Sequence, residues 1–241
     1  MSKLPIIITR VQPGAKQTAA RLEALGWNAI VSPALTLQSD PSVEIPDVED
    51  VSGIIFTSAN GARFYGERED DRSLPAWCVG PSTAAAARKE GFEEVHESTG
   101  NAVRLAALIA STIAPPEKPL LHVANAAAKG DLQRELKMRR YRVKHAPLYR
   151  AARAPDLDDR VKTIMNEGQK AIVLVHSAKG AEAFVELARD LPIASLIAVA
   201  ISRPAAAPLA ELGISDVHIS AAPNEDALMT TLQAVMDTLS A

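Results

Sequence analysis

The stretch Gly53-Ile-Ile-Phe-Thr-Ser-Ala-Asn-Gly-Ala-Arg63 contains the local pattern that the rest of the chain repeats or supports. Its apolar run, residues 54–56, predicts a short buried strand, and the polar residues that follow predict a turn into a helix. In an open α/β sheet, ligands bind just beyond the carboxyl ends of the strands. The free N–H groups at a helix N-terminus also favour anions. The stretch therefore predicts a strand, a turn and a helix, with a place for an anionic ligand at the turn.

The composition is that of a globular protein with an aliphatic core. Of the 241 residues, 47% are hydrophobic, 23% are charged and 4% are aromatic. This length allows one large domain or two small α/β domains. The net charge of −3 and the lack of a long basic block argue against DNA or RNA as a partner. The scarcity of aromatic residues argues against stacking surfaces for single-stranded nucleic acid.

The cysteine count and the N-terminus bear on the compartment. A single cysteine, Cys78, excludes an intrachain disulfide and a cysteine-rich metal site, and we interpret it as a buried core thiol. The N-terminal residues show no secretory signal pattern, and no apolar run approaches the length of a membrane span. We therefore expect a cytoplasmic protein that has no membrane partner.

Apolar runs alternate with helical patterns along the whole chain, which predicts parallel sheets covered by helices on both faces. Residues 39–50 are polar and acidic and contain proline, so we expect a loop there. Two of the predicted strands continue as extended chain, over residues 33–37 and 146–150. Ten strands are expected, at residues 5–10, 27–31, 54–56, 76–80, 94–98, 120–123, 141–145, 171–175, 196–201 and 216–220.

The chain is an internal duplication. Residues 5–35 align without a gap on residues 119–149, so that Pro33 matches Pro147. The turn at Ser58 matches the turn at Ser177. The order along the chain is therefore A-B-A′-B′, in which A contributes two strands and B contributes three. Five parallel strands for each unit predict two flavodoxin-like doubly wound domains.

Two pairings of these segments remain open from the duplication. A tandem split places the boundary in the proline cluster at residues 114–119. A crossed split joins A to B′ and leaves B with A′ as an inserted domain, with linkers near residues 33–38 and 147–151. The duplication by itself favours the tandem split.

Several short motifs, taken in their order and spacing, resemble the uroporphyrinogen-III synthase family over nearly the whole chain. They are Ile8-Thr9-Arg10, Pro33-Ala34-Leu35, Phe56-Thr57-Ser58-Ala59-Asn60-Gly61, Val79-Gly80-Pro81-Ser82-Thr83-Ala84, Gly100-Asn101 and Leu148-Tyr149-Arg150. The resemblance implies the crossed pairing: domain 1 at residues 1–35 and 152–241, and domain 2 at residues 36–151, joined by a two-stranded linker. It also implies an active site in the cleft between the domains, no cofactor, and a monomer.

The second half of the chain departs from the family pattern. Ser202 stands where the family has glycine, Ala205 where it has threonine, and Lys129 where it has arginine. His176 occupies the place that Thr57 holds in the first copy. The turns at residues 57–61 and 80–84 are therefore the better candidates for ligand contacts.

The implied substrate is hydroxymethylbilane, a linear tetrapyrrole with several carboxylates. The implied reaction, that of a cyclising lyase, removes the terminal hydroxyl as water and closes the ring with the last pyrrole inverted. This task is largely one of holding a conformation, which fits a chain without a Ser-His-Asp or Cys-His pattern. The alternative function is a non-catalytic, two-lobed module that binds a small anion.

Tyr149 is the candidate general acid, because a phenol next to a departing hydroxyl assists its loss. Its counterpart in the repeat is Leu35, so packing alone would accept an aliphatic side chain at this position. The alternative role is packing of the aromatic ring against a domain face. Carboxylate binding and helix capping are the competing roles for Thr57, Ser58, Asn60, Ser82, Thr83 and Asn101. For Arg10 they are pairing with a substrate carboxylate and an ordinary surface ion pair. The histidines show no metal-ligand spacing, so no metal is expected. The candidate substrate-binding residues are Thr9, Arg10, Thr57, Ser58, Ala59, Asn60, Ser82, Thr83, Asn101, Lys129 and Ser177.

Overall fold

The computed structural model describes residues 4–128 and 130–240 of the chain. The chain divides into two compact units. The first unit combines residues up to Leu37 with those from Ala152 onward, and the second is Gln38–Ala151.

The first unit contains a five-stranded sheet in the order β11-β10-β9-β1-β2. Its strands are β1 (Pro5–Ile8), β2 (Asn28–Val31), β9 (Ala171–Val175), β10 (Leu196–Ala200) and β11 (Asp216–Ile219). All four strand pairings are parallel. The strands come from both ends of the chain, so the N-terminal and C-terminal segments share one sheet.

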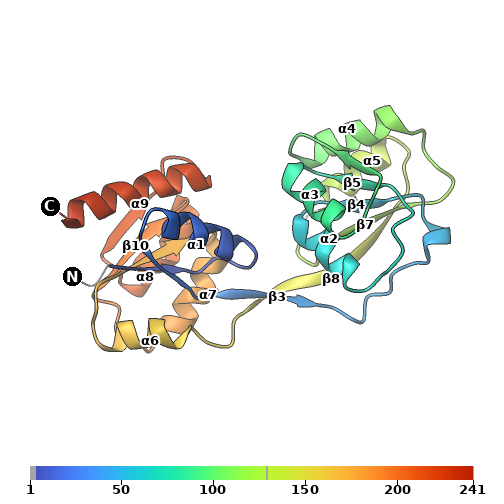
Figure 1. The fold of residues 1–241 in the computed structure, drawn as a ribbon. Helices are drawn as coiled ribbons and strands as arrows, with labels where there is room; N and C mark the ends of the chain where they lie inside the picture. Colours follow the sequence, from blue (N-terminus) through green and yellow to red (C-terminus); the bar gives the residue numbers. More distant parts are fainter. Residues whose placement is uncertain (1–3, 129, 241) are drawn as a thin grey trace. The chain divides into compact units, whose positions relative to one another are not determined.

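Helices cover both faces of this sheet (Figure 1), because its strands are apolar on both sides. On one face, Ile7, Val173 and Ala198 pack against α6 (Asp159–Asn166), α7 (Ala178–Ala188) and α8 (Arg203–Leu212). On the other face, Ile8, Leu174 and Val199 pack against α1 (Gly14–Ala24) and α9 (Glu225–Ser240). Successive side chains of a strand point to opposite faces, so continuous apolar runs are what a doubly covered sheet requires.

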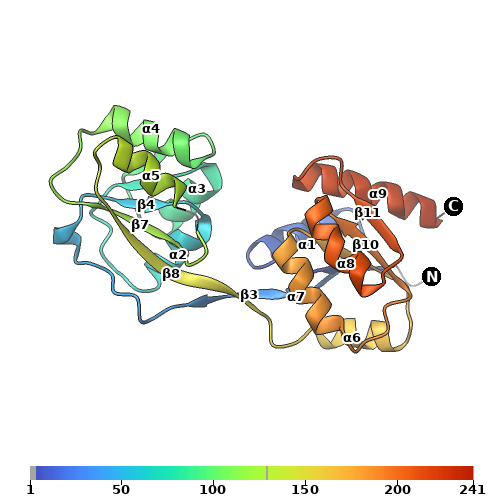
Figure 2. The same ribbon diagram turned by 180° about the vertical axis from the view of Figure 1, so that it is seen from behind.

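The second sheet has six strands in the order β3-β8-β7-β4-β5-β6, and four of them, β3, β8, β7 and β4, are labelled in Figure 2. It belongs to the second unit except for the first residues of β3 and the last residues of β8. The helices of this unit are α2 (Ala59–Gly66), α3 (Pro81–Lys89), α4 (Ala102–Thr112) and α5 (Asp131–Met138), with a short 3-10 helix, η1 (Val48–Asp50). The core on one face joins Ile55 and Trp77 to α4 and α5. The strands are β3 (Leu35–Ser39), β4 (Ile54–Phe56), β5 (Ala76–Cys78), β6 (Val95–Glu97), β7 (Leu120–Asn125) and β8 (Val143–Arg153).

The two sheets have the same spatial order with different connectivity. In the first, β2-β1-β9-β10-β11 follows the flavodoxin-like order 2-1-3-4-5. In the second, β8-β7-β4-β5-β6 reproduces that order, although the two strands that come first in unit one come last here. The strand order reverses between β1 and β9 and between β7 and β4. These are the positions at which doubly wound sheets bind ligands.

The predicted fold class, α/β with two doubly wound parallel sheets, is confirmed. The predicted strand count is wrong, because the described residues form eleven strands. Residues 35–39 form a separate strand, since Pro33 has no N–H to continue a ladder. Pro147 remains inside β8, where a register shift against β7 accommodates it. The expected loop at residues 39–50 is present except for η1.

Gly91 and Gly213 are equivalent in the repeat, and both have a left-handed backbone, with φ of 96° and 105°. A Cβ atom at Gly213 would meet only Ile193 Cδ1, at 3.6 Å, so a side chain has room there. Gly213→Ala should still destabilise the protein by about 1–2 kcal/mol, because an L-residue is strained at this φ. Urea unfolding measures the loss, and Gly213→Asn should lose less. An unchanged unfolding free energy in Gly213→Ala would contradict the left-handed backbone conformation of Gly213.

Candidate active site

Ser58 and Tyr149 lie together at the point where the second sheet reverses its strand order. Ser58 follows β4 in extended conformation and caps α2, its Oγ accepting a hydrogen bond from Gly61 N at 3.2 Å. The same Oγ lies 2.6 Å from the Tyr149 hydroxyl on β8. The Tyr149 ring stacks on Phe64 of α2 at 4.7 Å, and only 4% of the residue is exposed. The capping interpretation of Ser58 is therefore confirmed, and the Tyr149 ring packs on a helix as its alternative role predicts.

The surroundings of Tyr149 keep its hydroxyl protonated. Burial raises the pKa of Tyr149 above its usual value of 10.0, whereas the hydrogen bond with Ser58 and the charge of Arg63 act in the opposite direction. The net pKa shift is upward, so the phenol carries its proton at neutral pH. It is in the form that a general acid requires.

Thr57 pairs with a histidine that the sequence analysis did not single out. Thr57 Oγ1 lies 3.1 Å from His122 Nε2 on β7. His122 is 1% exposed, and its Nδ1 has no hydrogen-bond partner among the residues described. Burial, together with the nearby His145 ring at 5.4 Å, lowers the pKa of His122 to about 4. The imidazole is therefore neutral at pH 7.

The equivalent place in the first unit is organised around Glu225 at the start of α9. Glu225 accepts hydrogen bonds from Arg10 Nη1 at 2.9 Å and from Thr18 Oγ1 at 2.8 Å. His176 Nε2 lies 3.2 Å from Glu225, within ion-pair distance but without the geometry of a hydrogen bond. Burial alone would raise the pKa of Glu225, but the His176, Thr18 and Arg10 side chains outweigh it and lower that pKa to about 2. The ion-pair role considered for Arg10 is confirmed.

Three further candidates are engaged in local hydrogen bonds. Ser177 caps α7 as Ser58 caps α2, with Gly180 N donating to Ser177 Oγ at 3.0 Å. Thr9 is buried and its hydroxyl donates to the Leu174 carbonyl at 2.8 Å. Asn101 caps α4 by accepting from Arg104 N at 2.9 Å. The capping interpretation is thus confirmed for Asn101.

The remaining candidates lie in or near first helical turns. Ala59 and Asn60 begin α2, and Asn60 Oδ1 is buried without a partner in the described part of the chain. The capping interpretation of Ser82 and Thr83 is wrong, because Gly80 is the cap of α3 and no side chain caps that helix. Both residues lie inside the first turn, beyond the capping position; Ser82 is exposed and Thr83 is buried. Lys129 lies outside the described residues.

Neither a metal cluster nor a reactive thiol is found in the part of the chain that the structure describes. Its residues contain no group of three or more His, Cys, Asp or Glu side chains placed to hold a metal ion. Cys78 is buried, as expected for a core thiol, and burial raises the pKa of its thiol to about 12. A thiolate nucleophile is therefore not supplied by this residue.

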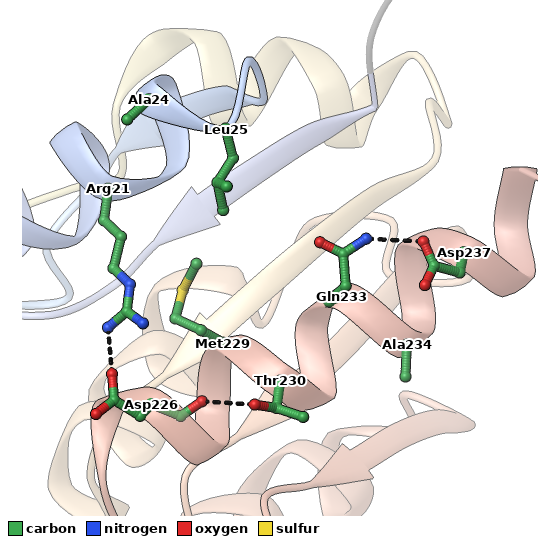
Figure 3. Close-up of a pocket in the computed structure, with 9 residues that line it drawn as sticks. All are labelled: Arg21, Ala24, Leu25, Asp226, Met229, Thr230, Gln233, Ala234 and Asp237. Carbon is green, nitrogen blue, oxygen red and sulfur yellow. Dashed lines mark hydrogen bonds and ion pairs between the residues drawn. The ribbon is translucent and has the colours of Figure 1, made fainter.

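A groove of about 700 Å³ lies between α1 and α9 in the first unit, and none of the candidate residues lines it (Figure 3). Its polar groups are paired with one another: Arg21 bonds Asp226 at 2.7 Å, and Gln233 bonds Asp237 at 2.7 Å. It is flanked by helices, whereas doubly wound sheets bind ligands at the carboxyl ends of their strands. Volume alone therefore does not make this groove the active site.

Comparison with known proteins identifies the family. A family model described as uroporphyrinogen-III synthase HemD matches residues 16–230. The chain belongs to this family. The porphyrin biosynthesis protein HemD of Ruminiclostridium josui is 24% identical over 215 residues, which are 83% of this chain and 42% of that protein. The uroporphyrinogen-III synthase of Chlorobaculum parvum is 25% identical over 95 residues, which are 36% and 39% of the two chains.

The family relationship extends to the fold. The crystal structure of uroporphyrinogen-III synthetase from Helicobacter pylori superposes with a TM-score of 0.64 at 16% identity, covering 96% of this chain and 99% of the other. The chain spans about two fifths of the length of the curated relatives it matches. Among the residues described, no helix is long and apolar enough to cross a membrane.

Sequence reasoning missed His122 and Glu225. A signal for His122 was present, because the repeat aligns it with Ile8, and a histidine within an apolar strand needs a partner. No such signal marked Glu225. It lies 215 residues from Arg10 in the sequence, and only the packing of α9 beside α1 brings the two side chains together.

The buried neutral His122 should make stability depend on pH. Its pKa is about 4 when folded and about 6.5 when unfolded, so between these values only the unfolded chain binds the proton. The part of the unfolding free energy that depends on His122 is therefore fully present above pH 6.5 and is lost as the pH falls toward 4. Relative to His122→Ile, the wild type should lose about 2–3 kcal/mol between pH 7 and pH 4.5. Urea unfolding at both pH values measures this. Parallel pH dependence in the two proteins would contradict it, since His145 is common to both.

Proposed function

We propose that the chain is a uroporphyrinogen-III synthase, which cyclises hydroxymethylbilane with loss of water and inversion of the last pyrrole ring. The family match over residues 16–230 supports the reaction class. The observation that carries the proposal is the Tyr149–Ser58 pair, 2.6 Å apart, at the reversal point of the second sheet. A protonated phenol hydrogen-bonded to a fixed hydroxyl is a suitable device for expelling a hydroxyl group.

Tyr149 acts as the general acid in this proposal. Its phenol donates a proton to the departing hydroxyl of the substrate, which leaves as water and creates an azafulvene cation. Ser58 then stabilises the phenolate oxygen by donating a hydrogen bond to it, while Gly61 N–H holds Ser58 Oγ in place. The proton that the substrate releases on ring closure restores the phenol. The stack on Phe64 fixes the ring plane. The cation is next attacked at a substituted pyrrole carbon, and the spiro species fragments and recloses with the ring inverted.

The protein's second task is to hold the conformation that leads to inversion, since the spontaneous product is the uninverted isomer. Carboxylates of the substrate accept hydrogen bonds from N–H groups at helix N-termini and from nearby hydroxyls. These donors bind anions without a basic surface, which agrees with a net charge of −3. The proposed contacts are Thr57, Ser58, Ala59, Asn60, Ser82, Thr83, Asn101 and Lys129, with Thr9, Arg10 and Ser177 from the first unit.

Thr9 and Arg10 already have partners within the protein. Thr9 donates both its hydroxyl hydrogen and its backbone N–H to the Leu174 carbonyl, so a contact with substrate would require it to release one of these bonds. Arg10 would have to exchange Glu225 for a substrate carboxylate. We further propose that the protein acts as a cytoplasmic monomer without a cofactor, with domain boundaries at residues 35/36 and 151/152.

The deciding experiment supplies hydroxymethylbilane to the purified protein and resolves the product isomers after oxidation. The inverted isomer, formed faster than the spontaneous ring closure, is the expected result. Formation of the uninverted isomer alone, at the spontaneous rate, would eliminate the enzyme. It would leave the chain as a module that binds small anions.

Tyr149→Phe tests the general acid. It removes one hydroxyl and keeps the stack on Phe64, so stability should fall by only about 1 kcal/mol through loss of the Ser58 bond. Turnover should fall by about 10²–10⁴-fold. Rapid-quench turnover and urea unfolding give the two quantities. Wild-type turnover in the folded variant would remove Tyr149 from the mechanism.

Ser58 and Ser177 form a matched pair, because each caps a helix with nearly the same geometry and only Ser58 contacts a tyrosine. Both Ser58→Ala and Ser177→Ala should lose about 1 kcal/mol of stability through the lost cap. Ser58→Ala should lose about 1 kcal/mol more, because it also removes the hydrogen bond with Tyr149. Ser58→Ala should lose about tenfold or more additional turnover, since it also removes the Tyr149 partner. Equal losses of turnover in the two variants would show that capping accounts for the whole effect.

A further inference from the structure

His122 is a polar residue at a position where the fold accepts an aliphatic side chain. The repeat aligns it with Ile8 of β1, which is fully buried, and His122 of β7 is 1% exposed. A buried imidazole must hydrogen-bond to offset its loss of water. His122 has one such bond, between Nε2 and Thr57 Oγ1 at 3.1 Å. The sheet therefore does not require an imidazole at this position, and the role of His122 lies in its hydrogen bond with Thr57.

The unpartnered Nδ1 determines which nitrogen carries the proton. A neutral imidazole has one N–H donor and one bare acceptor nitrogen. Nδ1 is buried without a partner in the described residues, and an orphaned buried N–H is rarer in proteins than an acceptor left unpaired. We therefore assign the proton to Nε2, so that Nε2–H is the donor to Thr57 Oγ1.

We propose that His122 is a positioning residue that occupies Thr57 Oγ1 as an acceptor and thereby turns the Thr57 O–H toward a carboxylate of the substrate. The proposal rests on the proposed function and assigns this subsite to a carboxylate. A hydroxyl can donate or accept, whereas an ionised carboxylate only accepts. Because a protonated Nε2 cannot accept a hydrogen bond, Thr57 cannot donate its O–H to the imidazole, and that hydrogen is left for the anion.

The first unit shows that this arrangement belongs to one copy only. There, His176 stands at the position of Thr57, and it lies 3.2 Å from Glu225. Ile8, the counterpart of His122, offers no hydrogen bond. The pair of a hydroxyl with a buried imidazole behind it thus occurs in the second unit, next to Ser58 and Tyr149.

The first test reads the tautomer directly and does not depend on activity. Long-range ¹H–¹⁵N correlation spectra of uniformly labelled protein at pH 7 report which ring nitrogen is protonated. The His122 signals are assigned as those missing from His122→Ile. The Nε2–H tautomer is the expected result, and an Nδ1–H tautomer would overturn the proposal.

The second test is a double-mutant cycle with Thr57→Val, which removes the hydroxyl at constant shape, and His122→Ile, which restores the residue of the other copy. Each single variant should raise KM for hydroxymethylbilane by about 5–20-fold and change kcat by less than about threefold. The double variant should be no worse than Thr57→Val, because His122 acts only through that hydroxyl. Additive losses would overturn the proposal.

Urea unfolding at pH 7 serves as the control for both variants, and His122→Ile should be at least as stable as the wild type because it loses an unpaired buried nitrogen. A wild-type protein without synthase activity would refute the proposed function, and the tautomer measurement would still decide the state of His122. The two failures are therefore distinguishable.

Discussion

The parallel pairing of β4 with β7 is the interaction on which the candidate site depends. It aligns Ile55 with His122 and Phe56 with Val123, although the strands lie more than sixty residues apart in the sequence. The pairing brings Thr57 to His122. Because β8 is the next strand in the sheet, it also brings Ser58 to Tyr149. All four side chains lie within one unit, where the strand order reverses. The chemistry therefore follows from a sheet that joins the B segment to the A′ segment.

The two units use equivalent positions differently. In the first, the hydroxyl of Thr9 and the guanidinium of Arg10 are satisfied by groups of the protein itself, and Glu225 occupies the place proposed for a substrate carboxylate. In the second, the Tyr149 hydroxyl bonds Ser58 and the Thr57 hydroxyl bonds His122, which are partners that can stabilise or orient a hydroxyl group. The asymmetry agrees with a reaction that needs one acid and several weak donors.

Local signals in the sequence predicted the features that depend on neighbouring residues. Ser58, Ser177 and Asn101 cap helices because a short polar side chain reaches the backbone N–H three residues later, which is a property of the local chain. The same logic failed at Ser82 and Thr83, because Gly80 took the capping position and Pro81 began the helix. The apolar runs that alternate with helical patterns predicted the fold class because they also depend on residues close together in the sequence.

Contacts between distant residues were not predictable in this way. The Arg10–Glu225 pair depends on how α9 packs beside α1 on one face of the sheet, and the pairing of Thr57 with His122 depends on strand register. Neither has a spacing in the sequence that would reveal it. Tyr149 was identified by resemblance and by its contrast with Leu35, but its partner Ser58 emerged only from the sheet order.

The duplication separates what the fold requires from what it merely permits. Leu35 and Ile8 are buried aliphatic residues, and the repeat aligns them with Tyr149 and His122, which are equally buried. A doubly wound sheet therefore forms without a phenol or an imidazole at these two positions. Burying such groups costs about 1–3 kcal/mol each unless they are hydrogen-bonded. Tyr149 and His122 recover part of this cost through Ser58 and Thr57, and His122 still leaves one nitrogen unpaired. Side chains that the fold does not need, held where doubly wound sheets bind ligands, are best explained by chemistry at that edge.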